Sequence, residues 1–156
     1  MAHYKKILIA INLADAPAQL SDKNTGHKSD NSLIIGRGLA ISGNKPESIH
    51  IIHACEHPIT GYGESTGKNH TVTETQIRQQ IFPALSLLAE YFHIPNENLH
   101  IAFGSPANVV HQLAQKIQAN LIVSGSHGKS GLSLLLGSTA TSILHDAKCD
   151  LLTVKI

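Results

Sequence analysis

The chain has 156 residues, of which 42% are hydrophobic and 15% are charged, and its formal net charge is +1. A disordered chain carries fewer aliphatic and more charged residues, so the composition excludes general disorder and predicts a single globular domain over residues 1–156. The chain has no run of basic residues to neutralise successive phosphates, and no Trp to stack on unpaired bases. Nucleic acid is therefore not an expected partner.

The cysteines and the first residues bear on the cellular compartment. Cys55 and Cys149 lie far apart and form no C-x-x-C pair, so we interpret them as reduced, partly buried thiols. The opening residues resemble a signal peptide, but the apolar run Ile7–Ile11 is only five residues long and stops at Asn12, which favours a buried first strand. No segment approaches the ~18 apolar residues of a membrane span. We expect a soluble, cytoplasmic protein without a membrane partner.

Short aliphatic runs alternate with helical patterns along the chain. This alternation is typical of βαβ units, in which helices cover both faces of a mostly parallel sheet. The predicted fold class is therefore α/β, with a doubly wound open sheet. Five strands are expected, at Lys6–Ile11, Ser48–Ala54, Leu99–Phe103, Leu121–Ser124 and Leu151–Val154.

Two helices have clear start signals. A capping-box pattern at Thr73 precedes apolar residues at helical spacing from Ile77 to Phe92, and Pro83 inside this helix predicts a bend. A serine followed by proline begins the second helix as its N-cap and first-turn residue. Its apolar stripe consists of Val110, Leu113 and Ile117.

The other helices are less distinct. Gly36 and Gly38 each cost about 1 kcal/mol relative to Ala inside a helix, so a helix over residues 32–41 needs burial of its apolar side chains. The side chains expected to supply that burial are Leu33, Ile34 and Leu39. A last helix is expected to start near Ser138 and to carry Ile143 and Leu144.

Two segments have no apolar period. Asp15–Asn31 is polar and is interpreted as an exposed loop or a frayed helix start. His57–His70 contains three glycines and is interpreted as a mobile loop at the mouth of a site, or as a plain connector.

The segment Leu121–Thr139 carries the strongest chemical signal. An aliphatic strand runs directly into Gly125 and Gly128, and a further glycine precedes Ser138 and Thr139 at a helix start. Glycines let backbone N–H groups approach phosphate oxygens, and a helix N-terminus adds unpaired donors. The pattern indicates an anion cradle, although helix capping alone would also select the two hydroxyl residues.

Two better-known nucleotide motifs are excluded. The sequence around Gly128 ends like a P-loop, but Val123 stands where that pattern requires its first glycine. A dinucleotide-binding G-x-G-x-x-G also fails, because Thr66 and Ile41 stand where the two candidate segments need the last glycine.

The glycine segment resembles the nucleotide signature of the universal stress protein family, which reads Gly, two residues, Gly, nine residues, then Gly with Ser or Thr. Here it reads Gly125-Ser126-His127-Gly128, followed by Gly137-Ser138. YKKILIAINLA is similar to the first strand of that family, IIHA to its second, and CDLLTVKI to its last. The segment from GSPANVV through LIVSGSHG is similar to its third strand through the signature loop. The resemblance covers nearly the whole chain except Asp15–Asn31 and the loop after His57.

The resemblance implies a five-stranded Rossmann-like fold of the adenine nucleotide alpha hydrolase type, with the first and fourth strands as neighbours. Their carboxyl ends then flank the crevice where open parallel sheets bind ligands. The implied ligand is ATP or a related adenine nucleotide such as ADP or AMP, with Mg²⁺ accompanying the phosphates. The implied role is that of a stress-response module.

The resemblance also implies the site residues by position. Those expected to face adenine and ribose are Ala10, Asn12 and Ala54. Those expected to hold ribose and phosphates are Ser124, Gly125, Gly128, Gly137, Ser138 and Thr139. His127 lies in the loop near the phosphates, and Lys129 either lends charge to them or is simply solvated.

The chain departs from the family pattern at two points. Eight residues rather than nine separate Gly128 from Gly137, which tightens the cradle or moves the helix start. Asn12 stands where the family usually places Asp, which keeps hydrogen bonding but removes a charge-assisted bond. Both departures favour the alternative hypothesis, a dimeric interaction protein of the same fold that binds no nucleotide.

The histidines and the last strand complete the prediction. His50 and His53 are three residues apart on a presumed strand and point to opposite faces, and the other histidines are scattered singly, so no metal site is expected. No partnered Ser/His/Asp set is found and no catalytic residue is assigned, so ATP hydrolysis would at most be slow. Leu151–Ile156 is apolar almost to the terminus, and as an edge strand it would pair in a homodimer, which the resemblance also implies. A covered edge in a monomer is the alternative.

Overall fold

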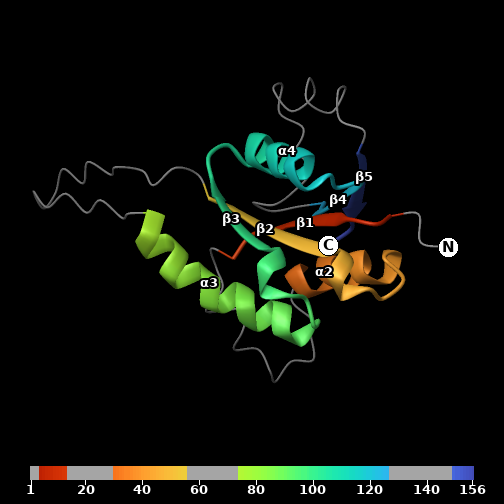
Figure 1. Cartoon of the computed structure of the whole chain (residues 1–156), viewed down its shortest axis with the longest axis horizontal. Helices are drawn as coiled ribbons and strands as arrows, with labels where there is room; N and C mark the ends of the chain where they lie inside the picture. The colour runs from red at the N-terminus through yellow and green to blue at the C-terminus, as the bar shows by residue number, and fades with distance from the viewer. Residues whose placement is uncertain (1–3, 14–29, 56–73, 127–148) are drawn as a thin grey trace, which may run out of the picture.

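A parallel five-stranded sheet forms the centre of the molecule. The computed structural model describes residues 4–13, 30–55, 74–126 and 149–156. The strands of these ranges form one sheet in the order β3-β2-β1-β4-β5, and every neighbouring pair is parallel (Figure 1). Their bounds are Ile7–Ile11 for β1, Ile49–Cys55 for β2, Leu99–Phe103 for β3, Leu121–Gly125 for β4 and Asp150–Val154 for β5. All five predicted strands are confirmed to within one residue at each end.

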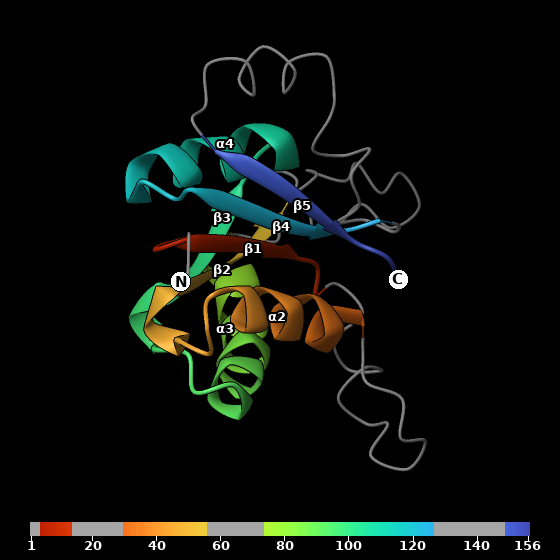
Figure 2. The same cartoon turned by 90° about the vertical axis from the view of Figure 1, so that its right-hand side faces the viewer.

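Helices cover both faces of this sheet. The helices α2 (Asp30–Ile41) and α3 (Glu74–Tyr91) lie on one face, and α4 (Pro106–Ile117) lies on the other (Figure 2). Short 3-10 turns, η1 (Pro46–Ser48) and η2 (Asn96–Asn98), lead into β2 and β3. Within the described ranges, no helix has both the length and the apolar character needed to cross a bilayer.

The central strand β1 belongs to both halves of the core. Its five side chains are all buried, as expected of a parallel strand that is covered on both faces. Ile7, Ile9 and Ile11 pack with the residues of α2 and α3, whereas Leu8 and Ala10 pack with those of α4. Alternation along the strand therefore sends odd-numbered side chains to the α2/α3 face and even-numbered side chains to the α4 face.

Close approach of α2 to β1 explains one of the two helix glycines. A Cβ atom added at Gly38 would lie 2.5 Å from Cδ1 of Ile9, whereas a Cβ added at Gly36 would meet nothing within 4 Å. This approach turns Ile34 and Ile35 toward the sheet. The expectation that Leu33 is buried is wrong: its side chain is 41% exposed, because it lies off the face that contains Gly38.

The other predicted helix features are confirmed in part. Helix α3 continues through Pro83 and buries Leu85, but Thr73 of the predicted capping box lies outside the described residues. Ser105 is the N-cap residue of α4, as predicted, but its side chain makes no capping hydrogen bond. Asp30 and Asn31, the last two residues of the segment Asp15–Asn31 that has no apolar period, form the first turn of α2. The rest of the first segment, the segment 57–70 and the helix expected near residue 138 lie outside the described residues.

The two helix glycines allow a matched stability test. We expect Gly36→Ala to raise the free energy of unfolding by about 0.5–1 kcal/mol, because Ala is the better helix former and the position is open. We expect Gly38→Ala to lower it by about 1–3 kcal/mol, because the new methyl group overlaps the buried Ile9. Urea denaturation of both variants measures the difference. Equal effects of the two substitutions would contradict the close approach of α2 to β1.

Candidate functional site

The strand order reverses direction at β1. The chain passes from β1 to β2 and β3 on one side, and then returns through α4 to form β4 on the other side of β1. As a general rule, connections leave in opposite directions from the carboxyl ends of two strands at such a reversal, and a crevice forms between them. In open parallel sheets this crevice is the place where ligands bind. The predicted adjacency of the first and fourth strands is confirmed.

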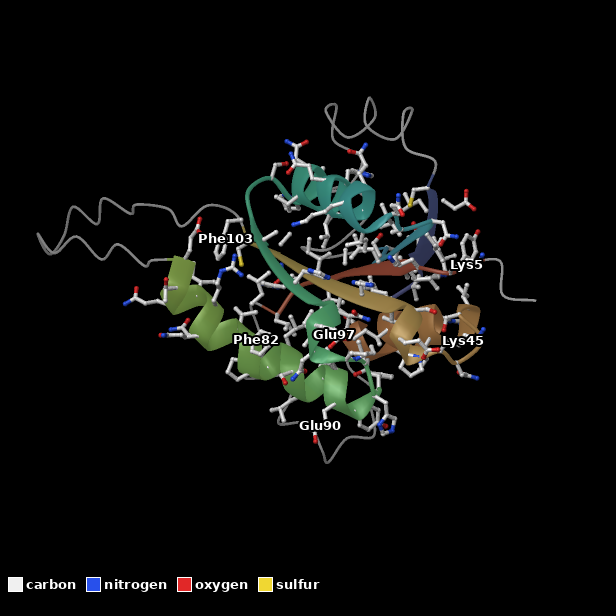
Figure 3. All side chains as sticks on the ribbon, in the orientation of Figure 1. Lys5, Lys45, Phe82, Glu90, Glu97 and Phe103 are labelled. Carbon is white, nitrogen blue, oxygen red and sulfur yellow. The ribbon has the colours of Figure 1, made fainter. Side chains whose placement is uncertain are left out.

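Four of the predicted site residues meet on one face at this end. β1 pairs with β2 through Ile11 and His53, and with β4 through Ile9 and Val123. If each register is continued by one residue, Ala54 lies beside Asn12, and Ser124 lies beside Ala10. The alternation of side chains then places on the α4 face the residues Ala10, Asn12, Ala54 and Ser124. Figure 3 shows Phe103 at this end of the sheet, and Lys5 and Lys45 at the end where the strands begin.

Ser124 has an unusual environment for a polar side chain. It is fully buried, and its Oγ atom has no hydrogen-bond partner among the residues that the structure describes. A buried hydroxyl without a partner loses its hydration and gains nothing in return, so such groups are rare and call for an explanation. The hydroxyl of Ser124 is thus a buried donor and acceptor without a partner among the described residues, on β4 beside the strand-order reversal.

Gly125 has a packing reason that sequence analysis did not find. A Cβ atom added there would lie 2.7 Å from Cδ1 of Ile156 and 3.1 Å from Cδ1 of Ile34. The next residue, Ser126, donates its N–H to the Val154 carbonyl over 2.9 Å, and its Oγ accepts the N–H of Ile156 over 3.1 Å. The first amide after Gly125 is therefore already bonded to the C-terminal segment. Any phosphate-binding amides of this loop have to follow Ser126.

The rest of the predicted cradle cannot be placed. The predicted site residues that lie outside the described residues are His127, Gly128, Lys129, Gly137, Ser138 and Thr139. Their assignment remains a prediction from the sequence.

The peptide group that follows β1 is held from both sides, a feature that sequence reasoning missed. The carbonyl of Asn12 accepts a hydrogen bond from Asn31 Nδ2 over 2.9 Å. The N–H of the same peptide, which belongs to Leu13, donates to His53 Nδ1 over 3.0 Å. Asn31 and His53 are only 5% and 4% exposed. In the sequence, the available signal was a polar residue near the end of an apolar run, such as Asn12 after β1 and His53 in β2. The spacing of these residues does not reveal which backbone groups they contact.

A histidine pair lies on the α4 face toward the strand starts. His50 Nδ1 and His100 Nε2 are 3.0 Å apart, and the ring centroids are 5.3 Å apart at an interplanar angle of 17°. These values require both nitrogens to lie near the line between the centroids, so the rings meet edge to edge through an N–H···N bond and are not stacked. The expectation that the remaining histidines are scattered singly is wrong for His100. Within the described residues, no group of three or more His, Cys, Asp or Glu is placed to hold a metal ion.

Burial controls the ionisation of this pair. Burial, then the neighbouring His100, then Lys6, lower the pKa of His50 to about 4. Burial and, secondarily, Lys116 lower the pKa of His100. Both rings are consequently neutral at neutral pH, as one shared proton between two facing nitrogens requires.

The two cysteines are free and half-buried, which confirms the prediction of unpaired thiols. Burial raises the pKa of Cys55, although Arg78 opposes that effect. Burial and the adjacent Asp150 raise the pKa of Cys149 to about 11. Neither thiol is therefore activated as a nucleophile, since only the thiolate is reactive.

Comparison with known proteins decides the family. The family model described as "Universal stress protein family" matches residues 28–155, a span that includes α2 and every strand from β2 to β5. The chain belongs to the universal stress protein family. This confirms the resemblance that the glycine segment indicated.

Relatives and solved structures agree with this assignment. This universal stress protein is 33% identical over 153 residues to Universal stress protein A homolog 1 of Coxiella burnetii, covering 97% of this chain and 96% of the relative. It also resembles the structure of a putative universal stress protein from Pseudomonas aeruginosa, with a TM-score of 0.59 and 24% identity. That match covers 96% of this chain but 47% of the other, so this chain spans about half of that protein. A universal stress protein solved in complex with cAMP matches with a TM-score of 0.52 and 19% identity, covering 97% of this chain and 96% of that one.

The low pKa of His50 predicts a pH-dependent stability. Between its ordinary value of 6.5 and about 4, the unfolded chain binds a proton at His50 that the folded protein does not. The contribution of His50 to the free energy of unfolding is therefore fully present above pH 6.5 and is lost as the pH is lowered toward 4. We expect His50→Gln to reduce this fall, measured by urea denaturation at pH 7.5 and 4.5. The same fall in both proteins would contradict the assignment to His50.

Proposed function

We propose that this universal stress protein binds an adenine nucleotide, ATP, ADP or AMP, in the crevice between the carboxyl ends of β1 and β4. The observation that carries the proposal is the buried Ser124 hydroxyl, which lacks a protein partner within the described residues and lies at the strand-order reversal. A ligand hydroxyl or phosphate oxygen would satisfy it. The related universal stress protein solved with cAMP, itself an adenine nucleotide, supports this ligand class.

The proposed contacts follow the two sides of the crevice. Ala10 and Ala54 offer small apolar surfaces, which leave room for a planar base, and Asn12 offers an amide for the base or ribose. The phosphates, with Mg²⁺, would extend toward the loop after Ser126. The loop residues proposed to hold them are His127, Gly128, Lys129, Gly137, Ser138 and Thr139.

We propose binding and not turnover as the function. The described residues at the crevice supply small side chains, a hydroxyl and an amide, none of which is a general base for phosphoryl transfer. We also propose a homodimer through β5. This strand pairs only with β4 among the described strands and leaves its other edge open to a second copy. Sedimentation of the purified protein measures the assembly.

The competing hypothesis is an interaction protein of the same fold that binds no nucleotide. Asn12 in place of the usual Asp favours it, as does the bond of the Ser126 amide to Val154. The two hypotheses differ in whether loop glycines are needed for a ligand or only for the fold.

Calorimetric titration with ATP and Mg²⁺ separates the two hypotheses. We expect binding at sub-millimolar concentration, and a loss of at least about tenfold in affinity for Gly128→Val, because a side chain there would exclude phosphate from the backbone. Gly36→Ala, which adds a methyl group in open space away from the crevice, is the matched control and should bind as the wild type does. Absence of heat at millimolar ATP with folded protein would reject nucleotide binding.

We expect Ser124→Ala to leave the stability unchanged or raise it, but to lower the affinity for ATP. Removing a buried hydroxyl that has no described partner should leave the stability unchanged or raise it by up to about 1 kcal/mol. The affinity for ATP should fall about three- to tenfold, because the ligand loses one hydrogen bond. Thermal unfolding without ligand and calorimetry with ligand measure the two effects. Unchanged affinity would exclude Ser124 from the site.

A further inference from the structure

The Asn12–Leu13 peptide is the first peptide beyond the end of β1. Inside β1, backbone groups bond to the neighbouring strands, whereas a peptide beyond the strand has no such ladder and its polar groups need other partners. Here two buried side chains supply them. Asn31 from the first turn of α2 donates to the carbonyl, and His53 from β2 accepts the N–H.

These two bonds determine the orientation of the peptide plane. A single hydrogen bond lets a peptide swing about the bond, whereas bonds at the carbonyl and at the N–H from different elements fix its rotation. The plane in turn sets the direction in which the Asn12 side chain leaves the backbone. Asn12 lies at the crevice, so the packing of α2 and β2 is coupled to the geometry of the proposed ligand site.

The bond from Leu13 also fixes the tautomer of His53. Nδ1 accepts a hydrogen bond and therefore has no proton, so the neutral ring carries its proton on Nε2. A second proton can enter only at Nδ1. It would replace the acceptor with a donor that faces the Leu13 N–H, and the bond would be lost.

The surroundings of His53 keep its ring neutral under ordinary conditions. Burial lowers the pKa of His53, and a backbone hydrogen bond with Ile11 opposes this only partly. The described charged residues of the helices on this face are exposed, and none is a cause of the shift; they are Asp30 and Arg37 on α2, and Glu74, Arg78 and Glu90 on α3. β1 and β3 contribute only apolar side chains to this face, and β2 itself contributes the uncharged Cys55 thiol.

We propose that Asn31 and His53 are positioning residues that hold the Asn12–Leu13 peptide so that Asn12 meets the nucleotide, and that protonation of His53 Nδ1 releases this peptide and weakens binding. The inference rests on the proposed function. It adds an acid-sensitive control of ligand affinity, and it assigns that control to a histidine outside the crevice.

Two variants at position 53 and one control variant at position 93 test the role of the acceptor. His53→Asn places an amide oxygen near the position of Nδ1 and accepts the N–H at every pH, whereas His53→Leu has a similar size and no acceptor. His93→Asn, at an exposed histidine with φ of 60° where Asn is tolerated, is the control for the general effect of pH. Circular dichroism confirms that each variant is folded.

The first readout is the dissociation constant of ATP with Mg²⁺, measured by calorimetry from pH 7.5 to 4.5. We expect the wild type and His93→Asn to lose about tenfold more affinity over this range than His53→Asn does, and His53→Leu to bind about tenfold more weakly than the wild type at pH 7.5. Identical pH profiles for the wild type and His53→Asn would overturn the inference and leave the proposed function intact. Absence of ATP binding by the wild type at pH 7.5 would reject the proposed function itself.

The second readout separates positioning from a general structural role. In an Asn12→Ala background, His53→Leu should change the affinity by less than about twofold, because the side chain to be positioned is gone. The full tenfold effect in that background would contradict positioning. As the pH is lowered, the hydrogen-exchange protection factor of the Leu13 amide should fall in the wild type and stay constant in His53→Asn. Constant protection in the wild type would show that the bond is not released.

Discussion

The parallel pairing of β1 with β2 on one side and β4 on the other is the constraint on which the rest of the structure depends. All five side chains of β1 are buried, and helices cover both of its faces. A strand enclosed in this way reaches the surface only at its ends. The carboxyl end of β1 therefore becomes the place where the strand order reverses, where the backbone needs new partners, and where polar side chains gather.

The two faces of the sheet differ in what they offer at that end. On the α4 face, the buried Ser124 hydroxyl lacks a partner among the described residues, beside the small side chains of Ala10 and Ala54. On the α2/α3 face, His53 Nδ1 accepts the N–H of Leu13 beyond β1. In the proposed function, the α4 face would present groups to the nucleotide, whereas His53 on the α2/α3 face bonds to the backbone beside Asn12.

The glycine-rich segment has more than one physical role. A Cβ atom at Gly125 would lie close to the side-chain ends of Ile156 and Ile34, so packing is one reason for glycine there that does not involve a ligand. The amide of Ser126 serves the pairing with β5. Ser126 at the end of β4 therefore lies beside the C-terminal segment, and among the described strands β5 forms the edge that the proposed dimer would use. A ligand at the loop and a partner at the edge would therefore act on neighbouring backbone.

The sequence by itself determined the five strands, three helices and the family, because aliphatic runs and glycine spacing are local properties of the chain. Only the tertiary structure decided which polar groups meet. His100 lies 50 residues from His50, and Asn31 and His53 converge on one peptide from different elements, so no spacing rule connects them. The exposure of Leu33 has the same origin, since the approach of Gly38 to Ile9 sets the rotation of α2. Contacts between distant segments follow from how helices pack on the sheet, and local sequence patterns do not predict that packing.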